Sequence, residues 1–118
     1  IAPSYKHNAH PNALISLWGA LQDTILIKST DGGIPVLLVH GTNDQIVPFN
    51  VGSPFNLISL PPTYGSNPIR KRLSNLNFGF ETYFVEGQGH EFYGVIINRP
   101  QGLTSMILVD LYIFMINQ

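Results

Sequence analysis

Two short stretches of the chain are almost continuously apolar, and a third is rich in β-branched and aromatic residues. They span residues 13–18, 34–40 and 81–85, and a glycine follows each of them within two residues. The stretch 34–40 gives the strongest strand signal, because apolar residues follow one another there without polar alternation. Such runs are typical of strands that are buried on both faces in a parallel sheet. We therefore predict three buried parallel strands.

Helical spacing is found between the second and third predicted strands. Ser66 or Asn67 can cap a helix in which Pro68 takes the first position, where a missing N–H costs nothing. The helix is predicted to run to about residue 77. Its inner stripe recurs at i, i+4 and i+7 and consists of Ile69, Leu73 and Leu76. The basic residues 70–72 are interpreted as a solvated face of this helix.

The remaining segments are predicted to be loops, apart from one further helix. Residues 1–12 and 43–65 are rich in Pro, Asn and Ser, which favours irregular structure. Residues 24–28 are sufficient for one or two helical turns, and residues 103–116 predict a final helix that is apolar nearly all round. Asp110 interrupts that helix, and about 20 apolar residues are needed to cross a bilayer, so no membrane span is predicted. Strands joined by helices predict an α/β fold with a parallel sheet.

Length and composition restrict the classes of protein to which the chain can belong. The chain has 118 residues, enough for one domain, of which 44% are apolar and 11% charged. This apolar content is high for so small a core, so we expect further protein to cover part of its surface. A net charge of −1 argues against a nucleic-acid partner. The absence of cysteine excludes disulfides and thiolate ligands, and the four histidines have no metal-ligand spacing.

Two titratable residues follow predicted strands and are candidates for catalysis. Asp44 follows the second strand in the segment HGTNDQIVP, and His90 follows the third strand in EGQGHEF. Functional groups of parallel sheets lie beyond the carboxyl ends of the strands. A carboxylate there can orient a histidine, which then takes a proton from a hydroxyl nucleophile. The alternatives are a turn-forming aspartate and a loop histidine bonded to backbone.

The arrangement resembles the closing section of the α/β-hydrolase fold. A buried strand followed by H-G-x-x-D-x-x-V-P, a helix, and a strand that ends in G-x-G-H is similar to that of esterases and lipases. The resemblance covers roughly residues 12 to 94. It implies that Asp44 is the acid and His90 the base of a Ser-His-Asp triad, in the family's chain order. Residues 51–65 are then an insertion near the mouth of the pocket.

The nucleophile that the family requires has no counterpart in these residues. The family serine lies in G-x-S-x-G between a strand and a helix, and no such motif is present. Gly52-Ser53-Pro54 lacks both the second glycine and a preceding strand. Residues 1–118 are therefore expected to be the C-terminal part of an α/β-hydrolase domain, without its nucleophile segment. The expected partner is the N-terminal part of the same enzyme or another copy of the chain.

Other residues near the predicted site receive weaker assignments. Trp18, Phe49 and Phe92 are candidates for an apolar substrate pocket, although ordinary packing explains each of them as well. His40 is interpreted as a structural residue near the site. His7 and His10 are expected on the surface.

The function predicted from the sequence is serine-dependent hydrolysis of a carboxylic ester, with a small-molecule ester as substrate. No cofactor is implied. Peptide, thioester and acetyl-sugar substrates remain open, because specificity in such folds depends on loops. The alternative is a non-catalytic binding or interaction module derived from a hydrolase fragment.

Overall fold

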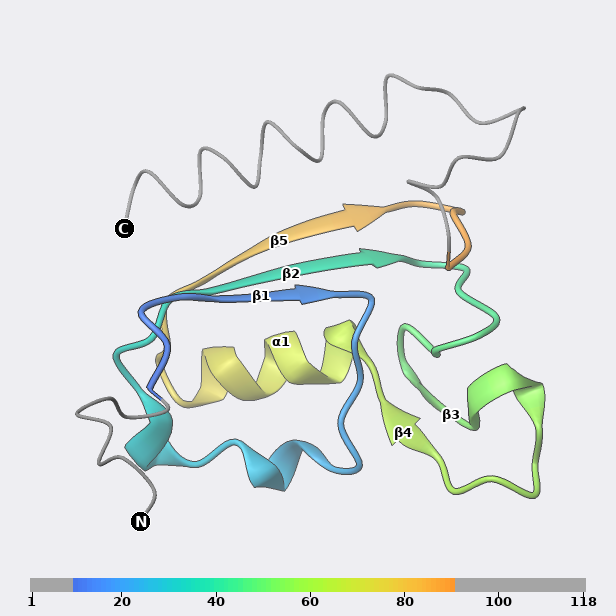
Figure 1. Cartoon of the computed structure of the whole chain (residues 1–118), viewed down its shortest axis with the longest axis horizontal. Helices are drawn as coiled ribbons and strands as arrows, with labels where there is room; N and C mark the ends of the chain where they lie inside the picture. The colour runs from blue at the N-terminus through green and yellow to red at the C-terminus, as the bar shows by residue number, and fades with distance from the viewer. Residues whose placement is uncertain (1–9, 91–118) are drawn as a thin grey trace, which may run out of the picture.

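The computed structural model describes residues 10–90, which contain a parallel sheet of three strands (Figure 1). The strands are β1 (Leu14–Leu17), β2 (Val36–Gly41) and β5 (Phe80–Val85), in the spatial order β1-β2-β5. Both neighbours run parallel to β2. The predicted α/β fold with a parallel sheet is therefore confirmed. The predicted helix over residues 103–116 lies outside the described residues.

The central strand and the first strand differ in burial. In β2, Leu37, Leu38 and Val39 are each at most 2% exposed, as expected of a strand covered on both faces. In β1, Leu14 is 44% exposed and Leu17 is 39% exposed. The prediction of burial is thus wrong for β1 in this chain, and also for the first half of β5, where Glu81 and Thr82 are exposed. Among the described residues β1 pairs only with β2, and an apolar run cannot bury itself without a neighbour.

Helix α1 (Ser66–Asn75) packs on one face of the sheet and places Ile69 and Leu73 against Leu38 (Figure 1). It begins two residues before the predicted first position, and Gly65 rather than Ser66 or Asn67 is its N-cap. The predicted cap is wrong because the Ser66 hydroxyl is bonded elsewhere, to a histidine of β2. The third stripe residue, Leu76, lies at the C-cap and is half-buried.

The predicted loop over residues 43–65 is mostly irregular, but it contains a short antiparallel ribbon. Its strands are β3 (Val51–Gly52) and β4 (Thr63–Tyr64). The 3-10 turn η3 (Pro54–Asn56) lies between them in the chain. Strands of two residues are too short for a sequence pattern to indicate them. The ribbon extends beyond the carboxyl end of the main sheet (Figure 1).

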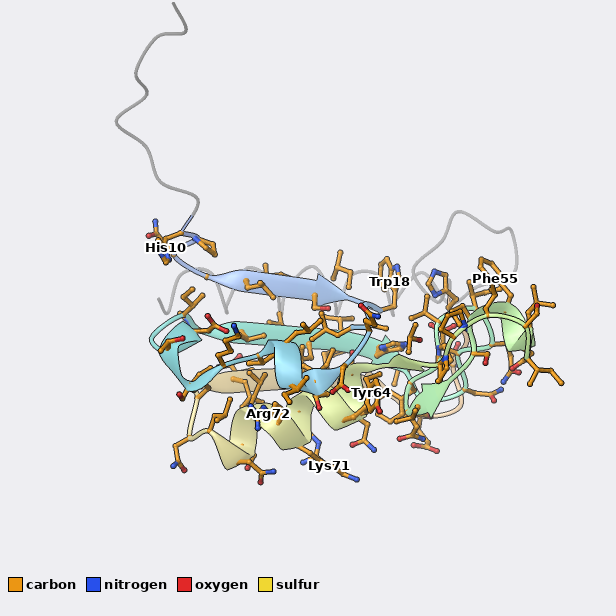
Figure 2. The ribbon with its side chains drawn as sticks, turned by 90° about the horizontal axis from the view of Figure 1, so that it is seen from below. His10, Trp18, Phe55, Tyr64, Lys71 and Arg72 are labelled. Carbon is orange, nitrogen blue, oxygen red and sulfur yellow. The ribbon has the colours of Figure 1, made fainter. Side chains whose placement is uncertain are left out.

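Side-chain hydrogen bonds attach α1 to the connection between β1 and β2. That connection contains the 3-10 turns η1 (Thr24–Leu26) and η2 (Ser29–Asp31). The guanidinium of Arg72 donates two hydrogen bonds to the carbonyl of Ile27, at 2.9 and 3.1 Å. The interpretation of residues 70–72 as a solvated face is therefore wrong for Arg72, while Lys71 is exposed (Figure 2). No helix within residues 10–90 has the length and apolar character needed to cross a membrane.

Candidate active site

The turn after β2 holds Asp44 in a fixed position. Its carboxylate is buried, and Oδ1 accepts hydrogen bonds from the amides of Ile46 at 2.8 Å and Val47 at 2.9 Å. This is the turn-forming role of an aspartate, which was one of the two interpretations of the sequence. The second carboxylate oxygen, Oδ2, takes no part in that turn, so a single side chain can fill both roles.

The turn after β5 is attached to the turn after β2 by backbone contacts. The amide of Thr42 donates to Val85 at 3.0 Å, and the amide of Asn43 donates to Gln88 at 3.0 Å. Gly41 makes this approach possible, because a Cβ atom there would lie 2.3 Å from the Gln88 carbonyl oxygen. The glycine at the end of β2 therefore lets the second turn cross over the first.

His90 comes to lie on Asp44 as a result. Its Nδ1 is 2.8 Å from Asp44 Oδ2, within hydrogen-bond distance, and its side chain is 20% exposed. The prediction that these two side chains lie side by side at the carboxyl edge of the sheet is confirmed. Within residues 10–90 no group hydrogen-bonds to Nε2 of His90. A carboxylate acceptor at Nδ1 leaves Nε2 of the neutral ring as a proton acceptor.

The ring of Trp18 packs against the ring of His90. The two rings meet edge-on, with centroids 5.9 Å apart and an interplanar angle of 72°. Figure 2 shows Trp18 at the carboxyl end of β1. Its backbone has a φ of +44°, a conformation that costs a bulky residue about 1–3 kcal/mol.

Phe49, the second predicted pocket residue, lies against other rings than that of His90. Phe49 packs edge-on against His40, with centroids 5.5 Å apart, and against Phe84, with centroids 4.8 Å apart. Its ring thus supports His40 and is not in ring contact with His90. Phe92 lies outside the described residues. Of the two candidates within residues 10–90, Trp18 is the one in ring contact with His90.

His40 is more closely involved with the site than its sequence context indicated. It is 0% exposed, and its Nε2 lies 3.1 Å from Asp44 Oδ2 while its Nδ1 lies 2.7 Å from the Ser66 hydroxyl. Burial lowers the pKa of His40 below the ordinary value of 6.5, although the Val47 carbonyl and the Asp44 charge oppose that shift. Ser66 was not identified as a site residue, since no local pattern connects it with a residue 26 positions earlier.

An open apolar cavity of about 510 Å³ lies beside β1, away from Asp44 and His90. Its wall includes Leu14 and Ser16 of β1, Leu38 of β2, and Ile69 and Leu73 of α1. Neither Asp44 nor His90 lines it. The cavity is therefore separate from the pair.

The described residues offer no metal site. Across residues 10–90, no cluster of three or more His, Cys, Asp or Glu side chains is arranged to hold an ion. The contact between His90 and Asp44 can support the transfer of a proton by a histidine that a carboxylate orients.

Comparison with known proteins does not assign the chain to a family. No protein-family model, no curated protein and no solved structure matches it.

Proposed function

We propose that Asp44 and His90 are the acid and base of a Ser-His-Asp triad that hydrolyses carboxylic esters, with the serine supplied from outside these 118 residues. The observation that carries the proposal is the 2.8 Å contact between His90 Nδ1 and Asp44 Oδ2 at the carboxyl edge of a parallel sheet. Acid and base follow neighbouring strands, as in the α/β-hydrolases that the sequence resembles.

The proposed reaction requires one proton shuttle. The serine hydroxyl attacks the ester carbonyl, and its proton passes to His90 Nε2 while Asp44 stabilises the resulting imidazolium. The tetrahedral intermediate then expels the alcohol, which takes that proton from His90 and leaves an acyl-serine. Water repeats the sequence on the acyl-serine, giving the carboxylic acid and free serine. No cofactor is consumed.

The surroundings of the pair favour an uncharged substrate. Residues 45–69 contain no Asp, Glu, Lys, Arg or His. Within them, the apolar loop (residues 51–60) exposes Phe55 by 59% and Ile58 by 96%. The loop lies beyond the carboxyl end of the sheet (Figure 2). Apolar side chains there suit an acyl or alcohol group and provide nothing to bind a phosphate.

Two features support a continuation of the sheet beyond β1. The strand has one hydrogen-bonded neighbour among the described residues and exposes Leu14 and Leu17. The apolar cavity opens directly below it. A further strand and helix at this edge would cover both features and would bring a residue that follows that strand to the side of Trp18 and His90.

The experiment has two stages. First, the coding sequence ahead of residue 1 is read for an in-frame G-x-S-x-G, which we expect roughly one hundred residues before Asp44. Second, the protein from the whole frame is tested for hydrolysis of a short aryl ester and for labelling by a fluorophosphonate, which reacts with activated serines. We expect both, and we expect the 118-residue chain alone to show neither. Turnover by the chain alone, lost in H90A, would show that these residues contain a nucleophile after all.

The exposed apolar loop also favours a second candidate, a non-catalytic interaction module. Contiguous exposed apolar side chains often mark surfaces that bind other proteins. A start codon directly ahead of residue 1, with no hydrolysis and no labelling in any complex of the chain, would establish this alternative and exclude the triad.

A further inference from the structure

His40 is a fully buried polar side chain with every ring nitrogen in contact with a partner. Nδ1 faces the Ser66 hydroxyl at 2.7 Å, and Nε2 faces both the Val47 carbonyl at 3.0 Å and Asp44 Oδ2 at 3.1 Å. The Phe49 ring packs against it edge-on. Burial of a histidine at the end of a strand is unfavourable unless these polar contacts are made.

The partners determine which nitrogen carries the proton. A carbonyl and a carboxylate can only accept hydrogen bonds, so Nε2 must be the donor. A neutral ring then has a lone pair on Nδ1, and the Ser66 hydroxyl donates to it. The lowered pKa of His40 agrees with a ring that stays neutral at physiological pH. The direction of each bond from Ser66 to Asp44 is therefore fixed.

The same contacts occupy the whole carboxylate of Asp44. Oδ1 accepts from the amides of Ile46 and Val47, while Oδ2 accepts from His90 and lies 3.1 Å from Nε2 of His40. Rotation of the carboxylate would break bonds on both oxygens together. His40 Nε2, which also meets the Val47 carbonyl, thus makes the second polar contact that keeps Oδ2 directed at the His90 ring.

Helix α1 holds Ser66 in place through a close backbone contact. A Cβ atom on Gly65 would lie 1.9 Å from the Pro48 carbonyl oxygen, so only glycine fits at the start of this helix. The amide of Gly65 donates to Asn50 at 2.9 Å, and that of Asn67 donates to Phe49 at 3.1 Å. The beginning of the helix is thereby attached to the loop that surrounds His40.

We propose that Ser66, His40, Asp44 and His90 form one network of polar contacts, the His40 network, in which His40 and Ser66 are positioning residues that act on His90 through Asp44. The inference rests on the proposed function for its catalytic meaning, since the network would hold the base in the tautomer that accepts a serine proton. Its geometry involves a part of the molecule, α1, that the triad itself does not use.

The test measures histidine tautomers in the 118-residue chain by nitrogen-15 imidazole spectra. We expect His40 to be neutral and protonated on Nε2, and neutral His90 to be protonated on Nδ1. In H40Q, the amide nitrogen replaces the donor at the Nε2 position, so His90 should keep its tautomer. In H40L that donor is lost, and His90 should show a mixture of both tautomers.

The role of Ser66 is tested by its substitution with alanine, and the same substitution at a second serine, Ser53, is the control. S66A should shift the His40 Nδ1 resonance and weaken the tautomer preference of His90. S53A, which removes an exposed hydroxyl that donates to the Leu60 carbonyl at 3.0 Å, should change neither. The network is overturned if His40 carries its proton on Nδ1, or if a folded H40L keeps His90 wholly in the Nδ1 form. If H40L does not fold, unchanged His40 and His90 spectra in S66A overturn it instead.

These spectra require no nucleophile, so they separate the two proposals. A directed network in a protein without hydrolysis or fluorophosphonate labelling would refute the triad and leave the network standing. Hydrolysis that depends on His90, together with an unaltered His90 tautomer in H40L, would refute the network and leave the triad standing.

Discussion

Two segments that follow β2 contrast in what they bury and what they expose. The end of β2 and the turn after it bury polar groups, with His40 0% and Asp44 6% exposed. The apolar loop that follows it exposes hydrophobic groups, with Ile58 96% and Phe55 59% exposed. Both are the reverse of the usual distribution of residues between core and surface.

The contrast shows that the two departures have different causes. The buried polar side chains are all satisfied, since no buried side-chain nitrogen or oxygen in the described part of the chain is without a hydrogen-bond partner. The function that we propose depends on the positions of these buried polar side chains. The exposed apolar side chains instead offer area that a substrate or further protein can cover. Five changes test this contrast, from the largest expected effect to the smallest.

Loss of the His90 imidazole should have the greatest effect on function. In the complete protein we expect H90A to lower kcat for an aryl ester by about four to six powers of ten, because a triad fails when one member is removed. H10A is the matched control, since His10 lies at the opposite end of β1 and should be dispensable (Figure 2). A loss of no more than about tenfold in H90A would remove His90 from the catalytic step.

Loss of the Asp44 carboxylate should have the greatest effect on stability. D44A leaves the amides of Ile46 and Val47 without their acceptor and removes the carboxylate that lies against His40 and His90. We expect the free energy of unfolding to fall by about 3–5 kcal/mol, as when a buried polar network loses its charged member. The control is D23A, which removes a half-buried N-cap carboxylate that accepts from the Ile25 amide and should cost about 1 kcal/mol. Equal losses in chemical denaturation would contradict the network.

A methyl group on Gly41 should separate the two turns. G41A places a Cβ atom 2.3 Å from the Gln88 carbonyl oxygen, so the turn that carries His90 must move. We expect a loss of about 1–3 kcal/mol in stability and the loss of the His90–Asp44 hydrogen bond, detected in imidazole spectra. G79A is the control, because nothing lies within 4 Å of a Cβ atom there. An intact His90–Asp44 bond in G41A would show that the close approach is not required.

The buried neutral His40 should make the protein sensitive to acid. Its pKa is lowered in the folded state, so below the ordinary value of 6.5 the unfolded chain binds more protons than the folded one. Stability therefore falls with falling pH below 6.5, by at most about 1.4 kcal/mol per pH unit for one group. Comparison of denaturation at several pH values in the parent and in H40Q isolates this slope. The same slope in both proteins would assign it to other groups.

A polar side chain in the apolar loop should have the smallest effect. We expect I58S to change the free energy of unfolding by less than about 0.5 kcal/mol, because Ile58 is 96% exposed and loses little contact. Thermal melting of the parent and of I58S measures the difference. A loss above about 1 kcal/mol would show that the loop packs against protein in solution, and that the contrast between the two segments is incomplete.

The sequence by itself determined the sheet and the pairing of Asp44 with His90. Apolar runs that lack polar alternation define buried parallel strands, and the carboxyl ends of such strands meet at one edge. Two titratable residues directly after neighbouring strands were therefore expected to meet, although they lie 46 positions apart. Helix α1 was also expected, because its inner residues recur with helical spacing.

Only the tertiary structure decided the parts of the site that depend on distant contacts. The start of α1, the bond between Ser66 and His40, and the left-handed backbone of Trp18 leave no local pattern in the sequence. The exposure of β1 likewise depends on which strand lies beside it, and its own residues do not encode that neighbour. The periodicity of a sequence shows which side of a segment is apolar. Tertiary packing decides which residues of distant segments come into contact. The positioning of His90 depends on this packing.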